Sequence, residues 1–553
     1  MENYDKLADL IFGDIDRTPA DYEAIYPERN LKEGARVTRI APSPTGYLHL
    51  GVLFSALVDE RIAHGSDGVF YVRIEDTDKK REVEGGLADI IQGFVNFGLK
   101  IDEGFTAPDR QEGLYGSYQQ SQRRDIYRCY VKDLMKKGLA YPCFCTAEEL
   151  AAVREEQDAQ KLRTGYYGKW AKCRDISYAE AKEKIEAGQP FVVRLKSPGS
   201  ENNRIVFDDM IKGKIEMPEN DQDIVLLKTD GIPTYHFAHA VDDHLMRTTH
   251  VIRGDEWIAS TPIHLQLFKL LGFKVPKYAH ISPIMKEENG GKRKLSKRKD
   301  PEAAVHYYAE QGYPADSVIE YLLTLMNSDF EDWRRMNLDA PNTAFKVNFK
   351  KMSVSGALFD LVKLNDVSKN TISRMPAETV CAQLLKWAEE YDPAFYALLQ
   401  RDPAYTQAVF SIDRGGKKPR KDIAKWSDAK EYAAYFYDEL FVNTYALPEN
   451  ICPADAAAAM EAYIPLYSEQ DDQNEWFEKL KQVSPQIGYA SEVKAYKADP
   501  SAYKGHVGDI GTMVRVAITG RTNSPDLCEI MKVLGKERSV ARLQKAAEIW
   551  KNQ

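Results

Sequence analysis

Apolar positions in the first hundred residues follow two different spacings. Residues 36–44 and 68–76 carry β-branched and aromatic side chains in short runs, which predicts strands. Residues 50–64 and 82–99 carry apolar side chains at helical spacing. This strand–helix–strand–helix series predicts an α/β fold with a parallel sheet, in which ligands bind at the carboxyl ends of the strands.

The pattern changes between residues 121 and 220. A helical run at 122–138, a charged helix near 147–162 and a strand-like run at 190–196 do not continue the earlier rhythm. We therefore expect an insertion here.

The sheet pattern resumes after the insertion, and helices dominate the rest of the chain. Residues 223–231 and 249–257 read as strands of the same parallel sheet, and residues 261–273 form an amphipathic helix. From about residue 300 the pattern is helical, ending with 539–550. The expected domains are an acidic N-terminal extension (1–35), the two halves of a Rossmann-like catalytic domain (36–120 and 221–276), an inserted α+β domain (121–220), a region that carries the basic run "KLSKR" (277–370) and a helical C-terminal region (371–553).

Composition places the chain among soluble globular proteins. Of 553 residues, 43% are hydrophobic and 29% charged, and no apolar run approaches the roughly 18 residues that span a bilayer. The first 35 residues are acidic and resemble neither a signal nor a transit peptide. Seven scattered cysteines argue against a disulfide framework, so we expect a cytoplasmic protein, and a monomer. The net charge of −9 argues against non-specific nucleic-acid binding but leaves room for local basic surfaces.

Two loops suggest phosphate chemistry. In Arg39–Gly51, "RIAPSPTGYLHLG", glycines and a following helix start could bring backbone N–H groups close to an anion, with His49 as a further donor. In Gly290–Asp300, "GGKRKLSKRKD", glycines flank six basic residues. Either loop alone could be an ordinary turn or a solvated basic surface. Together they predict a clamp for a nucleoside triphosphate.

These motifs are similar to those of a known family. "PSPTGYLHLG" at 42–51 and "KLSKR" at 294–298 resemble the two signatures of class I aminoacyl-tRNA synthetases. "RIEDTD" at 73–78 and the block 231–257 resemble the glutamyl-tRNA synthetases, and 514–543 resembles the end of that family's anticodon-binding region. The resemblance implies attachment of L-glutamate to tRNA(Glu) through a glutamyl-adenylate, with ATP and Mg²⁺.

The resemblance also implies site residues. His49, Lys294 and Lys297 would be catalytic, and Val52 stands where many class I enzymes carry a second histidine. The implied ATP-binding residues are Pro42, Thr45, Gly46, His49, Gly51, Lys294, Leu295, Ser296, Lys297 and Arg298.

Glutamate needs partners for two carboxylates and one ammonium group. By resemblance these are Arg39, Ala41, Ser43, Glu75, Tyr235 and Arg253. The role of His239 is left open, since relatives vary there. A glutaminyl-tRNA synthetase is the rival reading, but that family has a "PEPNG" first loop and lacks an arginine at the position of Arg253.

The inserted segment contains a candidate zinc site. Cys143 and Cys145 form a C-x-C pair, and Cys173 follows later in "YYGKWAKCRD". Asp175 or Tyr167 would supply the fourth ligand of a tetrahedral structural Zn²⁺, while three buried thiols without metal are the alternative. The insertion itself would hold the tRNA acceptor end, by resemblance.

A basic segment of the C-terminal region is a candidate tRNA contact. "DRGGKKPRKDIAKW" places basic residues near Trp426, which suits phosphate contact and base stacking, although a solvated loop is the alternative. The candidate residues are Arg414, Lys417, Lys418, Arg420 and Lys421.

Three questions stay open at this stage. The enzyme could charge tRNA(Glu) alone or also tRNA(Gln). The chain could be a non-catalytic RNA-binding relative or a tRNA-modifying paralogue, although the intact signatures and the roughly 250 residues after the second one argue against both. The extension 1–35 could cover the catalytic domain, bind a partner or be disordered.

Overall fold

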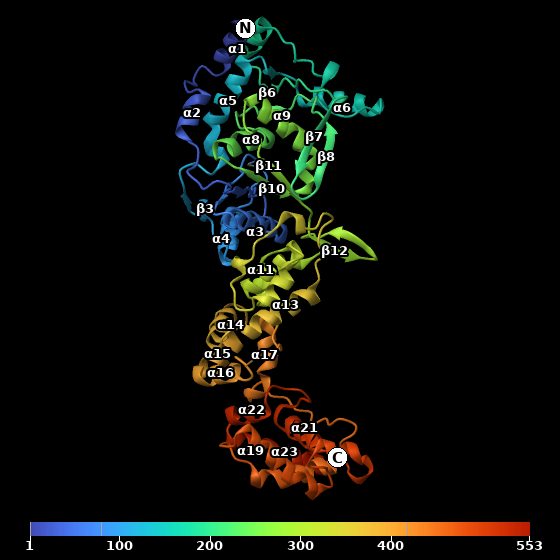
Figure 1. Ribbon diagram of the computed structural model, residues 1–553. Helices are drawn as coiled ribbons and strands as arrows, with labels where there is room; N and C mark the ends of the chain where they lie inside the picture. The colour runs from blue at the N-terminus through green and yellow to red at the C-terminus, as the bar shows by residue number, and fades with distance from the viewer. Residues whose placement is uncertain (1, 79, 417) are drawn as a thin grey trace. The chain divides into compact units, whose positions relative to one another are not determined.

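The computed structural model describes residues 2–78, 80–416 and 418–553, and the chain divides into two compact units. Unit 1 comprises residues 1–307 and 319–360, and unit 2 comprises residues 308–318 and 361–553. Figure 1 shows the elements of both units, coloured from blue at the N-terminus to red at the C-terminus.

The centre of unit 1 is the predicted parallel sheet. Strands β1 (Val37–Ile40), β2 (Val69–Val72) and β3 (Glu103–Ala107) run parallel, and β4 (Arg110–Glu112) closes that edge antiparallel to β3. Strands β10 (His250–Gly254) and β11 (Lys277–Ile281) are parallel to each other, and β10 lies beside β1, where the backbone N–H of Thr249 donates to the carbonyl of Val37 over 3.0 Å. The expected α/β Rossmann-like fold is confirmed.

Buried helices cover this sheet. They are α3 (Leu50–His64), α4 (Gly86–Asn96), α5 (Arg124–Lys136), α8 (Tyr235–Leu245) and α9 (Thr261–Leu271). Helix α3 follows β1 directly, and its residues 53, 54, 56–58, 62 and 63 are buried apolar side chains. The loop that starts α3 therefore lies at the carboxyl end of the sheet, where ligands of such folds bind.

The insertion is built differently from the sequence expectation. Strands β5 (Ala140–Cys143), β6 (Val192–Leu195) and β9 (Val225–Leu227) form one antiparallel sheet, near helices α6 (Ala147–Ala159) and α7 (Tyr178–Glu186). The run 223–231 was expected to resume the parallel sheet, and this expectation is wrong. Period-two alternation identifies a strand, but it does not identify the strand's partner.

A second part of the insertion joins the catalytic sheet. Strands β7 (Arg204–Asp209) and β8 (Gly213–Pro218) form a hairpin, and Asp209 pairs with Tyr278 of β11 in parallel. The boundary expected at residue 220 therefore does not separate the two sheets. Strands β7 and β8 come before it but belong to the sheet of β11, whereas β9 comes after it but pairs with β6. Asp209 of β7 is buried in unit 1.

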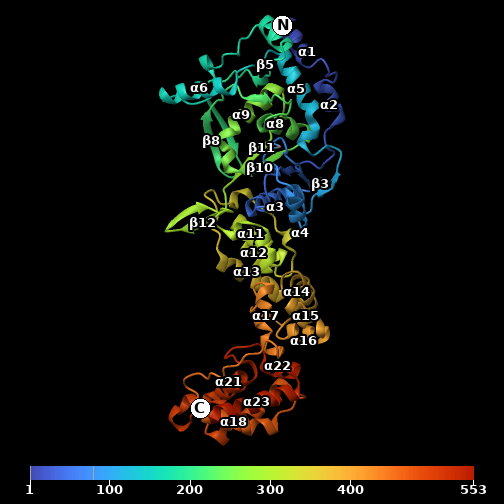
Figure 2. The same ribbon diagram turned by 180° about the vertical axis from the view of Figure 1, so that it is seen from behind.

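The N-terminal segment is ordered and packs on α5. Helix α1 (Glu2–Ile11) and helix α2 (Pro19–Ile25) run alongside α5 in both views (Figures 1 and 2). Among the alternatives for residues 1–35, the structure shows that this segment covers the catalytic domain. The apolar side chains that it buries there are Leu7, Ala8, Phe12, Ile15, Tyr22 and Tyr26.

The rest of unit 1 contains the hairpin of β12 (Met285–Glu288) and β13 (Gly291–Lys294) and helix α12 (Phe330–Met336), while α10 (His306–Gln311) and α11 (Ala315–Met326) have residues in both units. The regular elements described in unit 2 are otherwise helices, joined by loops such as 437–452. Its helices of eight or more residues are α13 (Leu361–Arg374), α14 (Ala377–Tyr391), α15 (Pro393–Arg401), α16 (Pro403–Ser411), α18 (Pro453–Tyr463), α19 (Gln473–Val483), α21 (Val507–Thr519), α22 (Leu527–Leu534) and α23 (Lys536–Lys551). The shorter ones are α17 (Ala429–Tyr432) and α20 (Val493–Ala498). None of the described helices combines the length and the apolar character needed to cross a bilayer.

Candidate active site

The first signature loop connects β1 to α3 and contacts the segment that follows β2. The Pro42 carbonyl accepts a hydrogen bond from the backbone N–H of Glu75 over 3.0 Å, and the Pro44 carbonyl accepts from Val83 over 2.9 Å. These bonds hold the loop against the segment that carries Glu75. Ser43 and Thr45 are exposed on the same loop.

His49 is the N-cap of α3. Its Nδ1 accepts a hydrogen bond from the backbone N–H of Gly51 over 2.9 Å, so the proton of the neutral ring must reside on Nε2. A Cβ atom at position 51 would lie only 3.2 Å from that Nδ1, which explains the glycine. Burial, followed by the charges of Lys297 and Lys294, lowers the pKa of His49 to about 4. At neutral pH His49 is therefore a neutral donor beside a helix N-terminus.

The lysine-rich loop lies against this first loop. The Lys297 ammonium donates to the carbonyl of Tyr47, and a Cβ at Gly46 would be 3.9 Å from Lys297 Nζ. The structure thus brings the two signatures together, since Tyr47 and Lys297 are 250 residues apart in the sequence.

Internal contacts hold the lysine-rich loop in shape. Arg293 makes two hydrogen bonds to Asp300, of 2.6 and 2.8 Å, and the Ser296 N–H donates to Asp300 over 2.9 Å. Leu295 is buried, whereas Lys294 and Arg298 are exposed. The loop therefore keeps one side in the protein and turns its cations outward.

A buried charge cluster lies below the loops. Arg39 Nε is 3.2 Å from both carboxylate oxygens of Asp243, and Arg73 Nη1 is 2.6 Å from Oδ1 of the same residue. Burial alone would raise the pKa of Asp243, but Arg39 and Arg73 hold it well below its usual value. Asp243 is thus a permanent anion that orients both guanidinium groups.

Glu75 lies at the edge of this cluster and contacts only one of its arginines, Arg73. Arg73 Nη2 donates to Glu75 Oε1 over 3.1 Å. Burial raises the pKa of Glu75 to about 7, although the charges of Arg73 and Arg39 oppose this shift. A substrate ammonium group would favour the ionised form.

Arg253 has a different environment. Its guanidinium donates to His280 Nε2 and Thr261 Oγ1, each over 3.0 Å, and to the Trp257 carbonyl over 3.3 Å, and its Nη1 lies 3.0 Å from His264 Nδ1. Among the described residues, no carboxylate lies within ion-pair distance of Arg253. This buried cation is available for an anionic ligand.

Aromatic rings connect the two arginine sites. The Tyr235 ring lies 4.3 Å from the Trp257 ring and stacks 5.8 Å from His239. His239 Nδ1 is 2.8 Å from Asp243 Oδ2, and its ring is 4.5 Å from that of His264, which contacts Arg253. Four of the residues predicted to bind glutamate therefore belong to one contact network. Arg39 and Tyr235 contact His239, and Arg253 is connected to His239 through His264. Glu75 is connected to the network through Arg73.

Sequence reasoning undervalued two residues here. It left the role of His239 open and did not select Arg73, yet both are completely buried and contact Asp243. The signal available for Arg73 was its place inside "RIEDTD", two residues before Glu75. For His239 the signal was its spacing of four residues from Asp243 on one helix.

The three predicted cysteines converge in the insertion. The ligand atoms of Cys143, Cys145 and Cys173 all lie within 4.8 Å of one another, and the sulfurs of Cys145 and Cys173 are 3.7 Å apart. The structure does not bring either predicted fourth ligand to the thiols. Asp175 accepts from Lys196 and its side chain is 82% exposed, and the Tyr167 hydroxyl donates to the Arg163 carbonyl.

The neighbouring tyrosine, Tyr166, lies beside the thiols instead. The hydroxyl of Tyr166 lies 3.4 Å from Cys143 Sγ and 3.3 Å from Cys145 Sγ. Tyr166 and Tyr167 are adjacent, and the direction of the backbone decides which of their side chains faces the thiols. The sequence pattern alone does not predict that direction.

The basic segment of unit 2 is only partly available to a ligand. Lys418 and Lys421 are exposed, and Lys417 lies outside the described residues. Arg420 is paired with Asp422 through bonds of 2.7 and 2.9 Å.

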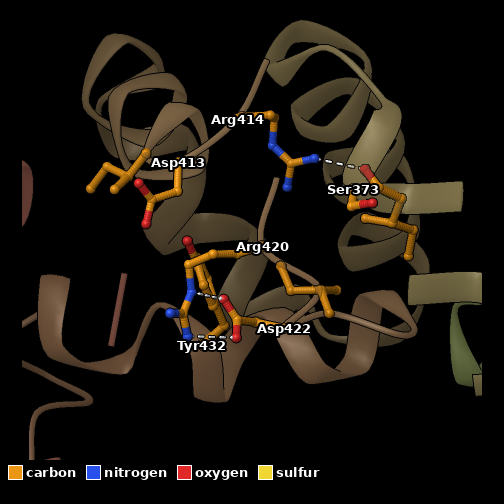
Figure 3. A pocket seen from close by; sticks show the side chains of 9 residues that line it. Ser373, Asp413, Arg414, Arg420, Asp422 and Tyr432 are labelled. Atoms are coloured by element: carbon orange, nitrogen blue, oxygen red, sulfur yellow. Dashed lines mark hydrogen bonds and ion pairs between the residues drawn. The ribbon is translucent and has the colours of Figure 1, made fainter. Parts of the chain in front are cut away.

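Arg414 and Trp426 have structural positions instead. Figure 3 shows Arg414 directed across a small cavity toward the backbone beside Ser373, where its Nη1 donates to the Ile372 carbonyl over 2.7 Å. The cavity, of about 10 Å³, holds roughly one water molecule. Trp426 is buried, so it cannot stack on a base as expected from the sequence. The exposed lysines remain as candidate phosphate contacts.

Comparison with known proteins agrees with this geometry. Residues 36–366 match the family "tRNA synthetases class I (E and Q), catalytic domain", and residues 420–547 match the family "Anticodon binding domain". A glutamate–tRNA ligase of Clostridium perfringens (strain SM101 / Type A) is 54% identical over 98% of this chain and 99% of its own length. Another, of Clostridium beijerinckii, is 51% identical over 99% of this chain. The matched part therefore includes most of the N-terminal segment 1–35.

A solved structure is similar over most of the chain. It is that of a glutamate tRNA ligase from Elizabethkingia meningosepticum in complex with its amino acid, with a TM-score of 0.73 and 27% identity, covering 93% of this chain and 99% of that one. Sequence families, relatives and fold agree, and the chain belongs to the class I tRNA synthetases (E and Q).

Proposed function

We propose that this chain attaches L-glutamate to the 3′ end of tRNA(Glu) in two steps that use ATP. The observation that carries the proposal is the environment of Arg253, a buried cation held by neutral groups and facing no carboxylate among the described residues. The charged side chain of glutamate supplies the missing anion, whereas the neutral amide of glutamine would leave the guanidinium charge unbalanced.

The remaining groups of glutamate have partners in the same region. Glu75 receives the ammonium group, and Arg39 contacts a carboxylate while Asp243 holds its guanidinium in place. Tyr235 and Ser43 donate hydrogen bonds. The aromatic contacts of Tyr235 with Trp257 and His239 keep its ring in a single orientation.

In the first step, the α-carboxylate of glutamate attacks the α-phosphorus of ATP and pyrophosphate leaves. The His49 Nε2–H and the N-terminus of α3 donate to phosphate oxygens, and Lys294 and Lys297 balance the charge that develops on the triphosphate. Mg²⁺ bound with ATP would neutralise part of the charge of the triphosphate. Positioning and electrostatics are sufficient, and no protein nucleophile is required.

In the second step, the terminal ribose hydroxyl of tRNA attacks the activated carbonyl and AMP leaves. The insertion would hold the acceptor end of the tRNA, and the exposed Lys418 and Lys421 of unit 2 would contact its phosphates. Arg420 is a weaker candidate for a phosphate contact because its guanidinium already forms an ion pair with Asp422. A monomer in the cytoplasm is the state that we propose.

The decisive experiment is aminoacylation of purified tRNA(Glu) and tRNA(Gln) with labelled glutamate and, in parallel, labelled glutamine, in the presence of ATP and Mg²⁺. We expect glutamate on tRNA(Glu) and no transfer of glutamine. Glutamate on both tRNAs would establish a non-discriminating enzyme. Transfer of glutamine, or no transfer at all, would refute the proposed reaction.

We also propose a structural Zn²⁺ held by Cys143, Cys145 and Cys173, with the Tyr166 hydroxyl as the fourth donor. Tetrahedral zinc with Zn–S bonds of about 2.3 Å places its sulfur ligands about 3.8 Å apart, which fits the 3.7 Å between Cys145 and Cys173. Such an ion would tie β5 to the segment near residue 173.

Metal analysis of the purified protein tests this site. We expect one zinc per chain, lost in Cys173→Ser and retained in Cys452→Ser, because Cys452 is exposed and does not belong to the cluster. A zinc content that is zero in the unaltered protein, or equal in both variants, would contradict the proposal.

A further inference from the structure

The groups that accept hydrogen bonds from Arg253 are neutral, and a buried carboxylate lies behind one of them. His280 Nε2 accepts from Arg253 Nε over 3.0 Å, and on the far side of that ring His280 Nδ1 lies 2.7 Å from Asp209 Oδ2. His280 is completely buried and Asp209 nearly so. Because a guanidinium can only donate, His280 Nε2 must carry a lone pair, and its proton must be on Nδ1, facing Asp209.

The second imidazole near Arg253, that of His264, has the opposite tautomer. His264 Nδ1 lies 3.0 Å from Arg253 Nη1 and must accept, so the proton of His264 is on Nε2 and donates to His236 Nδ1 over 2.9 Å. Burial lowers the pKa of His236 to about 4 and holds that of His264 well below its ordinary value, so both rings remain neutral.

The neutrality of these acceptors has a consequence for the ligand. Arg39 and Arg73 each contact a carboxylate of the protein directly, Asp243 in both cases and also Glu75 for Arg73. Neutral groups accept four hydrogen bonds from the five N–H donors of Arg253, and they do not balance its charge. The attraction of Arg253 for an anion is therefore kept for the substrate.

We propose that His280 and His264 are positioning residues that aim Arg253 at the side-chain carboxylate of the amino-acid substrate, with Asp209 selecting the tautomer of His280. This inference rests on the proposed function, in which Arg253 contacts that carboxylate. Asp209 ends β7, and its other oxygen accepts from Ile211 and Lys212 at the turn into β8. A residue of the inserted segment thereby supports the amino-acid site.

The two histidines permit a crossed substitution test. A glutamine side chain places its oxygen near the position of a histidine Nε2, and an asparagine side chain places its oxygen near Nδ1. At position 280 the acceptor toward Arg253 is Nε2, so His280→Gln keeps it and His280→Asn loses it. At position 264 the acceptor is Nδ1, so His264→Asn keeps it and His264→Gln loses it.

The measured quantities are KM for glutamate, KM for ATP, kcat and the midpoint of thermal unfolding. We expect KM for glutamate to rise about tenfold or more in His280→Asn and His264→Gln, and to stay within about threefold in His280→Gln and His264→Asn. KM for ATP should change less than about twofold in all four. Asp209→Asn should resemble His280→Asn, because the amide can donate to His280 Nδ1 and so turn a donor toward Arg253.

A purely structural role predicts a different pattern, since both substitutions at each position would then lower the unfolding midpoint and raise both KM values alike. That result would overturn the inference. Arg253→Met separates the two proposals. If it raises KM for glutamate while the histidine variants do not differ, only the positioning role fails. If it leaves KM for glutamate unchanged, the contact of Arg253 with the carboxylate fails, and the inference fails with it.

Discussion

At the scale of single residues, the same carboxylate type serves two roles because its surroundings differ. Asp243 contacts two guanidinium groups and stays ionised at every working pH. Glu75 contacts one of them at 3.1 Å and is otherwise buried, which raises its pKa to about 7. The first residue is part of the scaffold, and the second can respond to a ligand.

The pKa of Glu75 predicts a pH dependence of substrate affinity. A protonated Glu75 cannot balance the ammonium group, so KM for glutamate should rise as pH falls through about 7, by about tenfold between pH 8 and pH 6. The carboxylates of glutamate stay ionised in this range, and KM for ATP should not follow. Initial rates at varied glutamate measure the effect. Glu75→Gln should show a high KM without this pH dependence, and a KM that is flat with pH in the unaltered enzyme would contradict the prediction.

At the scale of elements, the N-terminal segment braces the end of α8. Glu23 Oε1 lies 2.6 Å from His244 Nε2, and Glu23 Oε2 accepts from Arg247 over 2.8 Å. Arg29 makes a bidentate contact with Glu103 and donates to the Met246 carbonyl. Helix α8 carries Tyr235, His239 and Asp243, so the segment supports the helix that builds much of the site.

Removing apolar contacts of this segment should therefore destabilise unit 1. Phe12 is buried, and Phe12→Ala should cost about 3 kcal/mol and lower the first thermal transition in calorimetry by several degrees. Lys32→Ala is the control, because Lys32 pairs with Asp67 at the surface, where solvent screens the attraction and little stability is lost. Equal transitions for the two variants would show that the segment is only loosely attached.

At the scale of the whole molecule, the two compact units carry different chemistry. Unit 1 contains the buried charge cluster and both signature loops, and unit 2 contains the exposed lysines of the basic segment. A tRNA substrate is long enough to use both kinds of surface, whereas glutamate and ATP need only the first. Substitutions in unit 2 should accordingly separate tRNA affinity from small-molecule affinity.

The double variant Lys418→Gln, Lys421→Gln tests this separation. We expect a higher KM for tRNA, unchanged KM for glutamate and ATP, and a smaller slope of log affinity against log salt, by about 0.7–0.9 for each lost phosphate contact. Filter binding between roughly 50 and 200 mM salt measures the slope. The exposed lysines 494 and 545 provide a charge-matched control pair. Equal effects of both pairs would indicate general electrostatics, and no effect of either would exclude the contact.

Arg414 should behave differently from these lysines. Its donors reach the carbonyls of Phe410, Ile372 and Met375, so a substitution there removes internal hydrogen bonds before it removes any contact with tRNA. Grouping it with Lys418 from sequence was reasonable, because both are basic residues of one short segment. Only burial distinguishes them.

The sequence by itself determined the sheet and helix series of the first hundred residues, and it supplied the two candidate phosphate loops and the candidate ligand residues. These features are local: period-two and helical spacing report strands and helices directly, and Arg39, His49 and Lys297 stand inside continuous motifs. The tertiary structure alone decided the partner of β9, the tyrosine beside the thiols and the supports of the arginines. Arg39 and Asp243 are 204 residues apart, and Asp209 and His280 are 71 apart. Such contacts depend on which strands become neighbours, and hydrophobic periodicity carries no information about that choice.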